Sequence, residues 1–206
     1  MTPNSIESSI DKTNITGVIL AGGCATRMGG QDKGLIQLNG KCLIEYVITL
    51  LRPQVGELLI SANRNQAHYA KLCTCPVLAD TFGNYAGPLA GIATTLAQAQ
   101  TDYVLFVPCD SPCLNPQLVE RLSAFMLKVH ADISVANDGK RMHPVFSLWK
   151  RHLLTDLLTF LRTGKRSMHR FLARHSLAQT DFSSTPENFL NINTPKELTT
   201  LNKITK

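Results

Sequence analysis

Short apolar runs alternate with segments of helical spacing along most of the chain. Strands are predicted at 17–20, 57–62, 76–78, 103–107, 132–136 and 142–149, where apolar and β-branched residues cluster. Helices are predicted at 43–51, 89–98, 115–129, 151–161, 168–175 and 195–202. This alternation of strands and helices is typical of an α/β fold with a mostly parallel sheet.

The first fourteen residues depart from this pattern. They are rich in Ser, Thr and Asn and show no hydrophobic periodicity. Chain ends of this kind are usually poorly held. We therefore predict that residues 1–14 form a mobile N-terminal extension. Residues 15–206 are predicted to form a single domain, since domains usually run to roughly 100 to 200 residues.

The first predicted strand ends in a loop that combines glycines with two basic residues. The glycines are Gly22, Gly23, Gly29 and Gly30. Glycine lets backbone amides approach a ligand, and successive amides in such a turn form an anion-binding concavity. Arg27 can bind phosphate oxygens in a bidentate manner, and Lys33 supplies a flexible point charge. The loop is predicted to bind phosphate, with a solvated surface loop as the alternative.

The spacing of this loop differs from that of the two common phosphate-binding motifs. The loop contains neither G-x-x-x-x-G-K-[ST] nor G-x-G-x-x-G. It is therefore neither a P-loop nor a dinucleotide fingerprint.

The run at 103–107 is wholly apolar, which predicts a central strand. Asp110 follows it, at the end of the sheet where open parallel sheets bind ligands. Because Mg²⁺ prefers a carboxylate together with substrate phosphates and water, Asp110 is a candidate metal ligand. The alternative is a turn or N-cap aspartate between two prolines. Cys109 is expected to be a packed residue, since no histidine neighbours it in sequence.

Other polar residues follow the remaining strands. Asn63 can offer a donor and an acceptor to a base or sugar, or it can be an ordinary turn residue. Asp80 can bind a base or ribose, or cap a turn. Gly87 precedes a helix whose N-terminus can attract an anion. His143 is a candidate for the second substrate, although a packed histidine is the commoner explanation.

Composition narrows the class of ligand and the compartment. The net charge is +6 and the pI is near 9.1, but the basic residues are scattered, which favours a small anionic ligand over nucleic acid. Hydrophobic residues make up 44% of the chain, enough for a full core. The six cysteines have no zinc spacing, and no apolar run has membrane-spanning length. We expect a cytoplasmic protein with reduced thiols and no membrane contact.

Three short motifs together carry a family resemblance. They are Leu20-Ala21-Gly22-Gly23, Arg27-Met28-Gly29-Gly30 and Asp32-Lys33-Gly34. Their order resembles that of the MobA family of molybdenum cofactor guanylyltransferases, and the likeness extends from Ile15 to Asn191-Ile192-Asn193-Thr194-Pro195. The resemblance implies a Rossmann-like, three-layer α/β/α nucleotidyltransferase fold.

The resemblance also implies a reaction and its residues. GMP would pass from GTP to molybdenum-molybdopterin cofactor with release of pyrophosphate, and transient contact with proteins that supply or receive the cofactor would be compatible. The implied catalytic residues are Arg27, Lys33 and Asp110, with Mg²⁺ on Asp110. The implied nucleotide-binding residues are Leu20, Ala21, Gly22, Gly23, Lys33, Asn63, Asp80 and Asp110. The implied acceptor-binding residues are Gly87, Gly91, Arg166, Asn191 and Asn193.

Three rival functions remain open on sequence grounds. A cytidylyltransferase for the same cofactor typically has Ala where this chain has Gly22, so Gly22 favours guanine. A sugar-phosphate nucleotidyltransferase usually carries extra domains, for which 206 residues leave little room. A GTP-binding adaptor without turnover would not need Arg27, Lys33 and Asp110 together.

Overall fold

The computed structural model describes residues 10–21, 24–25, 30–81, 87–192, 194 and 197–198 of the protein. The strands are β1 (Ile15–Leu20), β2 (Cys24–Ala25), β3 (Gln31–Asp32), β4 (Gln37–Leu38), β5 (Lys41–Cys42), β6 (Glu57–Ser61), β7 (Val77–Leu78), β8 (Tyr103–Pro108), β9 (Ile133–Asn137), β10 (Met142–Lys150) and β11 (Leu177–Asp181). The α-helices are α1 (Leu43–Leu51), α2 (Gln66–Leu72), α3 (Pro88–Gln98), α4 (Leu118–Lys128), α5 (Leu154–Arg162) and α6 (Met168–Leu172).

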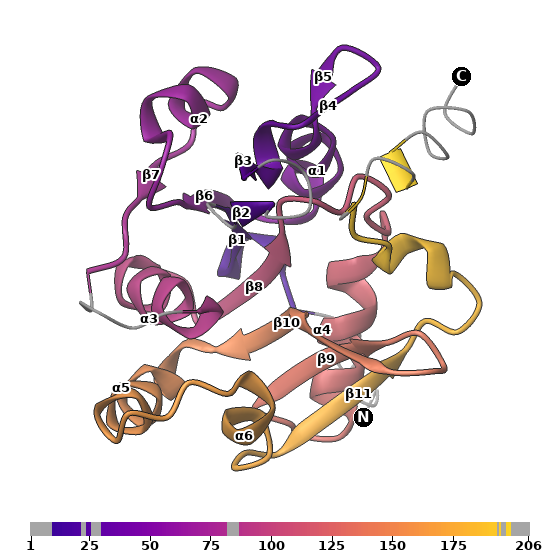
Figure 1. Cartoon of the computed structure of the whole chain (residues 1–206). Helices are drawn as coiled ribbons and strands as arrows, with labels where there is room; N and C mark the ends of the chain where they lie inside the picture. The colour runs from indigo at the N-terminus through magenta and orange to yellow at the C-terminus, as the bar shows by residue number, and fades with distance from the viewer. Residues whose placement is uncertain are drawn as a thin grey trace.

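The main sheet has seven strands in the order β11-β9-β10-β8-β1-β6-β7. Strand β1 pairs in parallel with β6 on one side and β8 on the other. Strand β10 runs antiparallel to both of its neighbours, β8 and β9. The predicted α/β fold with a mostly parallel sheet is therefore confirmed (Figure 1).

Two apolar cores flank the sheet because successive strand residues point to opposite faces. Ile19 of β1 faces a core filled from α1 and α4, whereas Val18 faces a second core filled from α3 and α5. Figure 1 shows these helix pairs on the two sides of the sheet. The resulting three layers hold the strand ends in fixed register.

Most predicted elements match the structure, and α1 has the predicted bounds. Helix α4 begins at Leu118 instead of residue 115, and a turn at residues 116–117 precedes it. Asn115 Oδ1 accepts from the Gln117 amide at 2.8 Å, and its Nδ2 donates to Asn188 Oδ1 at 2.8 Å. Asn115 therefore fastens the C-terminal segment and is not the helix cap.

Strand β11 was not among the predicted elements. Only its alternate residues Ala178 and Thr180 are buried, and Thr180 shares a buried hydrogen bond of 2.8 Å with Ser134 of β9. The strand forms one edge of the sheet, so it needs few apolar residues. Alternating buried and exposed residues, several of them polar, predict a strand less clearly than the continuous apolar run of a central strand does.

Packing begins before residue 15, the start of the predicted domain. Asp11 caps a 3₁₀ turn over Lys12–Asn14, and Ile10 packs against the first core. Asn14 Nδ2 donates to Asp102 Oδ2 at 3.0 Å. Residues 10–14 are thus joined to the sheet by specific contacts.

Cys73 and Cys75 form a disulfide, so the expectation of reduced thiols throughout is wrong for this pair. Cys73 ends α2 and Cys75 precedes β7, with one residue between them. A tight bend between a helix and a strand brings the two sulfur atoms together. A Cys-x-Cys spacing belongs to neither the common zinc-ligand patterns nor a multi-disulfide framework, so it gave no sign of this bond.

Within the part of the chain that the structure describes, no helix combines the length and apolar character needed to cross a bilayer.

Gly56 lets the N-terminal turn approach the start of β6. A Cβ at Gly56 would lie 2.8 Å from Thr13 Cα and 2.9 Å from the Lys12 carbonyl oxygen. Gly56→Ala should therefore lower the free energy of unfolding by about 1 to 3 kcal/mol, because backbone atoms would have to move. At Gly17, a Cβ would meet side-chain methyl groups of Val55 at 3.1 Å, which can shift.

Gly17→Ala is the matched control, and urea denaturation of both variants is the measurement. We expect Gly17→Ala to lose less free energy of unfolding than Gly56→Ala. If Gly56→Ala loses the same or less free energy of unfolding than Gly17→Ala, the turn at residues 12–14 does not pack closely enough against Gly56 to exclude a Cβ atom.

Candidate active site

Three strands deliver their following loops to one edge of the sheet. Leu20 pairs with Pro108 of β8 and with Ser61 of β6. The pattern continues past the strands, since the Cys109 amide donates to the Leu20 carbonyl at 3.1 Å and the Ala21 amide donates to the Ser61 carbonyl at 2.7 Å. This carboxyl edge is where open α/β sheets bind ligands.

An ion pair joins two of these loops. Lys33 Nζ lies 3.0 Å from Asp110 Oδ2, with the lysine side chain 24% exposed and the aspartate side chain 5% exposed. A buried carboxylate is costly unless a cation or hydrogen bonds compensate it. Lys33 supplies that compensation, and its partial exposure lets the amine also face a ligand.

The turn that carries Lys33 is anchored through Asp32 to helix α2 and to Asn65, the residue that precedes that helix. Asp32 is buried, and its carboxylate accepts from the Tyr69 hydroxyl at 2.5 Å and from Asn65 Nδ2 at 3.1 Å. A Cβ at Gly34 would lie 2.6 Å from the Tyr69 oxygen, so this glycine permits the close approach. The network fixes the 3₁₀ turn Lys33–Leu35 against the body of the protein.

Cys109 lies against this network as a packed thiol. Burial raises the pKa of Cys109 well above its ordinary value, and the negative charges of Asp110 and Asp32 raise that pKa further. A nucleophilic cysteine needs the opposite, a lowered pKa. The structure therefore agrees with the packing role expected for Cys109.

A second polar group lies at the end of β6. Asn63 Nδ2 donates to Asp80 Oδ2 at 2.8 Å, and the Asp80 amide donates to Asn63 Oδ1 at 2.8 Å. A Cβ at Gly91 would lie 2.6 Å from Ser61 Oγ, 3.3 Å from Leu20 Cδ2 and 3.4 Å from Asp80 Oδ1. Gly91 thus allows α3 to come close to these residues. The predicted nucleotide residues Leu20, Asn63 and Asp80 are brought together.

The C-terminal segment returns to Asp110. The Ile192 amide donates to the Asp110 carbonyl at 3.0 Å, and Asn191 Oδ1 accepts from Ser111 Oγ at 2.6 Å. Asn191 is therefore adjacent to the residue predicted to hold the metal. Beyond it, the Glu197 amide donates to Thr194 Oγ1 at 3.3 Å, as expected for a helix cap.

The remaining predicted residues divide into two sets. Gly87 is the N-cap of α3 with a φ of 110°, and Arg166 is exposed in the turn between α5 and α6. The structure thus separates these two residues onto different segments. Four predicted residues lie outside the described part of the chain, namely Gly22, Gly23, Arg27 and Asn193.

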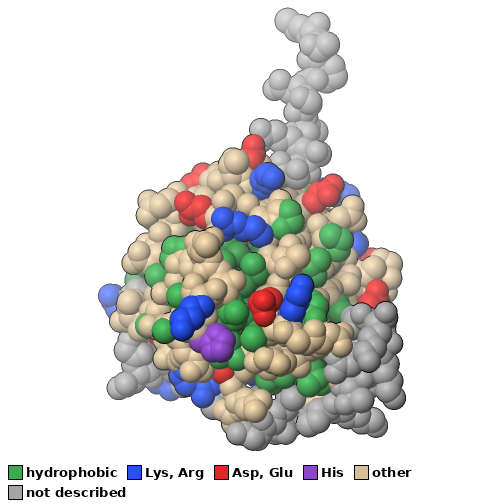
Figure 2. Space-filling model, turned by 90° about the horizontal axis from the view of Figure 1, so that it is seen from above, with side chains coloured by type: hydrophobic (Ala, Val, Ile, Leu, Met, Phe, Trp, Pro, Cys, Tyr) green, Lys and Arg blue, Asp and Glu red, His purple; other side chains and the backbone are tan. Residues whose placement is uncertain are grey.

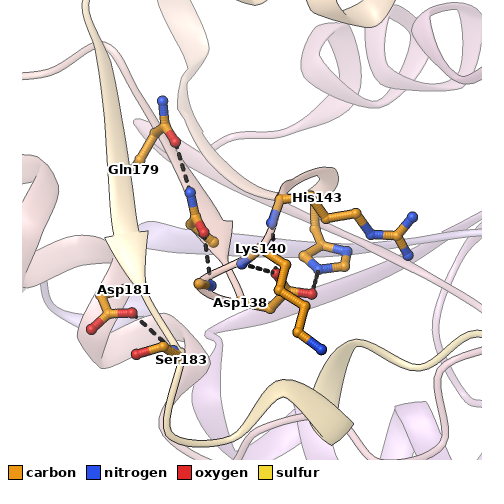
Figure 3. Close-up of polar contacts among 9 residues, drawn as sticks. Asp138, Lys140, His143, Gln179, Asp181 and Ser183 are labelled. Atoms are coloured by element: carbon orange, nitrogen blue, oxygen red, sulfur yellow. Dashed lines mark hydrogen bonds and ion pairs between the residues drawn. The ribbon is translucent and has the colours of Figure 1, made fainter.

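His143 is held by the turn between β9 and β10 (Figure 3). Its Nε2 lies 2.9 Å from Asp138 Oδ2, and its ring stacks on Phe189 with centroids 4.9 Å apart. The hydrogen bond with His143 lowers the pKa of Asp138, and the amides of Arg141 and Lys140 lower it further. Asp138 is therefore ionised at neutral pH.

Sequence reasoning assigned no role to Asp32, Tyr69, Ser111 or Asp138. Asp32 belongs to the quoted motif Asp32-Lys33-Gly34, so the motif itself contained a signal. Asp138 lies in the turn between β9 and β10, five residues before His143, and that spacing matches no common motif. Tyr69 and Ser111 act through contacts distant in sequence.

The Asp110 carboxylate is the kind of group that Mg²⁺ takes as a ligand. Among the residues that the structure describes, no cluster of three or more His, Cys, Asp or Glu side chains is suited to hold a metal. Mg²⁺ often takes one or two carboxylates and completes its shell with phosphates and water. The buried Asp110 carboxylate meets that requirement.

Charge is spread over the visible face of the molecule. Among the described residues on the face drawn in Figure 2, basic side chains are separated by hydrophobic and acidic ones.

Comparisons with known proteins agree with this geometry. The model for the MobA-like NTP transferase domain matches residues 17–180. The chain is 46% identical over 189 residues to molybdenum cofactor guanylyltransferase of Shewanella amazonensis, covering 92% of this chain and 96% of that protein. It is 47% identical over 190 residues to the enzyme of the same name from Vibrio cholerae, covering 92% of each.

Solved structures share the fold at lower identity. Molybdopterin-guanine dinucleotide biosynthesis protein A of Archaeoglobus fulgidus superposes with a TM-score of 0.78 at 21% identity, over 92% of this chain and 98% of that one. A CMP:2-keto-3-deoxy-manno-octonic acid synthetase complexed with CTP gives a TM-score of 0.72 at 13% identity, over 93% and 98% of the two chains.

The family model and the relatives at 46% and 47% identity show that the chain is a nucleotidyltransferase, and the parallel-sheet edge that holds the Lys33–Asp110 pair agrees with this class. Within that class, the chain belongs to the molybdenum cofactor guanylyltransferases of the MobA-like NTP transferase family.

Tyr69→Phe tests the hydrogen bond between Tyr69 and Asp32, which anchors the turn that carries Lys33. Removing the hydroxyl leaves the buried Asp32 carboxylate without one donor, which should lower the free energy of unfolding by about 1 to 3 kcal/mol. Tyr46→Phe is the control, because the Tyr46 hydroxyl donates to a neutral carbonyl, that of Leu38, at 2.7 Å. Denaturant titration should give the larger loss for Tyr69→Phe. Equal losses would mean that Asp32 does not depend on this bond.

Proposed function

We propose that this protein transfers the GMP unit of GTP to the terminal phosphate of molybdopterin cofactor and releases pyrophosphate. The observation that carries the proposal is the Lys33–Asp110 ion pair at the shared edge of β1 and β8. The names of the relatives at 46% and 47% identity support the same substrates. The proposal takes Mg²⁺ as the metal and the cytoplasm as the compartment.

The reaction requires positioning and charge neutralisation more than a covalent nucleophile. The acceptor phosphate would attack the α-phosphorus of GTP in line, and pyrophosphate would leave on the opposite side. Lys33 and Arg27 would bind phosphate oxygens whose negative charge grows as that bond breaks. Asp110 would hold Mg²⁺, which when bound would neutralise phosphate charge.

Residues on two sides of Asp110 would bind the two substrates. The Asn63–Asp80 pair, with Leu20 and Gly91 beside it, offers hydrogen-bonding groups next to an apolar surface, as a purine nucleoside requires. Gly22 and Gly23 would contribute backbone amides to the nucleotide, and Ala21, whose own amide donates to the Ser61 carbonyl, would lie against it through its other atoms. The acceptor would lie toward Asn191, with Gly87, Arg166 and Asn193 as the further acceptor residues. Gly91, which the resemblance also assigned to the acceptor, lies beside Leu20 and Asp80 and is therefore assigned to the nucleotide side in this proposal.

Base choice distinguishes this function from its nearest rival, cytidylyl transfer. Cytidylyltransferases of this cofactor typically have Ala at the position of Gly22, so we expect Gly22 to favour guanine and GTP to bind more tightly than CTP. The test supplies the purified protein with acceptor, Mg²⁺ and either nucleotide, and follows pyrophosphate release together with the dinucleotide product. Equal or faster turnover with CTP would overturn the guanylyl assignment. Nucleotide binding without any pyrophosphate release would favour an adaptor.

Asp110→Asn tests the metal and phosphate role of the buried carboxylate. The substitution nearly keeps the shape but removes the charge, so turnover should fall by about 100-fold or more. Asp102→Asn is the control, because Asp102 bonds to Asn14 near the amino end of β8. Steady-state rates against Mg²⁺ concentration, with circular dichroism to check folding, are the measurement. Wild-type rates with wild-type metal dependence would leave Asp110 as a turn residue only.

Lys33→Ala and the double variant Asn191→Ala, Asn193→Ala test the division of the site. Loss of Lys33 removes a charge-assisted phosphate contact, so GTP should bind more weakly and the acceptor nearly as before. Loss of the two asparagines should weaken acceptor binding by about 1 to 3 kcal/mol and leave GTP almost unchanged. Calorimetry that measures the Kd of GTP and the Kd of the acceptor for each variant tests this division. The opposite pattern would mean that the acceptor has been assigned to the wrong side.

A further inference from the structure

A cavity of about 470 Å³ lies beside the start of β10, on the acceptor side of Asp110. Its polar lining comes from Arg141, His143, His169 and Asn191, and its apolar lining includes Phe146. A volume of this size is typical of sites for small molecules. None of the lining residues that the structure describes is acidic, so the lining suits an anionic ligand.

A β-bulge shapes this cavity. His143 pairs with Ala136 of β9, but the next paired residue of β10 is Ser147, which pairs with Val135. The three residues between them leave the ladder, and Pro144 lacks the amide that a regular ladder would need. Bulges redirect side chains and are frequent beside functional sites. Here the bulge supplies part of the cavity wall.

Asn191 connects the cavity to the nucleotide side. It lines the cavity and accepts from Ser111 Oγ at 2.6 Å, while the next amide, that of Ile192, binds the Asp110 carbonyl. A ligand in the cavity would thus have one end close to Asp110. The Asn63–Asp80 pair lies at the end of β6, on the other side of β1 and β8.

We propose that this cavity binds the pterin ring of the phosphorylated acceptor, and that Asp138 is a positioning residue that orients His143 to hydrogen-bond the ring. This inference rests on the proposed function, because that function supplies a pterin as the acceptor. A pterin is flat and carries N–H donors and ring acceptors at its edge. The cavity offers aromatic surface from Phe146 and His143 together with the polar groups of Asn191 and Arg141.

Three contacts fix the imidazole of His143. Asp138 Oδ2 lies 2.9 Å from Nε2, Phe189 stacks on one face with an interplanar angle of 22°, and Phe146 meets the ring edge-on at 5.9 Å. Since Asp138 is ionised, Nε2 must carry the proton in this bond. Nδ1 is then the ring atom left to meet a ligand, as an acceptor in the neutral ring or a donor in the charged one.

The Asp138–His143 pair is hard to explain by stability alone. Both side chains are largely buried, at 12% and 8% exposure, and buried ion pairs are often no more stabilising than apolar residues of the same volume. Asp138 Oδ1 separately accepts from the amides of Lys140 and Arg141 at 2.8 Å each. The turn therefore uses one carboxylate oxygen, and the other is available to orient His143 (Figure 3).

Asp138→Asn separates these two roles. The amide oxygen can keep both turn hydrogen bonds, but the amide nitrogen would face Nε2 and force the imidazole into its other tautomer. Asp181→Asn is a matched control, because Asp181 Oδ1 also accepts a local amide, from Ser183 at 2.8 Å, in the neighbouring turn. His143→Phe keeps the stacking surface and removes both ring nitrogens.

Fluorescence titration of the whole protein with a pterin monophosphate is the direct test, with calorimetry of GTP in parallel. Asp138→Asn and His143→Phe should each raise the pterin Kd about tenfold, the usual size of one hydrogen bond. The GTP Kd and the midpoint of thermal unfolding of Asp138→Asn should stay near wild type. In the His143→Phe background, Asp138→Asn should have no further effect on pterin binding, since a positioning residue acts only through its partner.

The outcomes distinguish this inference from the proposed function. Wild-type pterin affinity in both variants, or no pterin binding by the wild type, overturns the inference even if GMP transfer occurs. Additive losses in the double variant overturn the positioning role. Pterin binding that follows the expected pattern without nucleotide transfer supports the cavity assignment and overturns the proposed function.

Discussion

The parallel pairing of β1 with β8 is the constraint on which the site depends. Leu20 pairs with Pro108, so the two following loops leave the sheet at the same edge and bring Lys33 to Asp110. Asp110 is only 4% exposed, and a buried carboxylate requires compensation. The Lys33 amine 3.0 Å away provides it. The fold itself therefore brings a cation and an anion together at this edge of the sheet.

Local patterns in the sequence predicted much of this arrangement. The apolar spacing at 43–51 predicted where α1 begins and ends, because a helix that packs on one face has a buried apolar residue on that face in every turn. The apolar run of β8 indicated a central strand, and the rule for parallel sheets then located Asp110 at the ligand edge. The motif Asp32-Lys33-Gly34 identified Lys33, although it gave no partner for Asp32.

The features that the sequence left unpredicted depend on partners. Tyr69 binds Asp32 across a separation of 37 residues, and a buried tyrosine on a short helix gives no indication of which carboxylate it meets. Strand β11 has polar residues at alternate positions, so its pairing with β9 is needed to recognise it. Hydrophobic periodicity reports which residues are buried. It does not report which hydrogen bonds satisfy the buried polar groups, and those bonds support Lys33 and His143.

Strand β10 explains why the two halves of the site differ in construction. As the antiparallel member of the sheet, it begins at the edge where its neighbours β8 and β9 end. His143 at its start can therefore meet Asp138, which follows β9, without a crossover. The β1, β6 and β8 side is instead built from successive parallel strand ends. Asn191 and Ile192 join the two sides, because Asn191 lines the cavity and binds Ser111 while the Ile192 amide binds the Asp110 carbonyl.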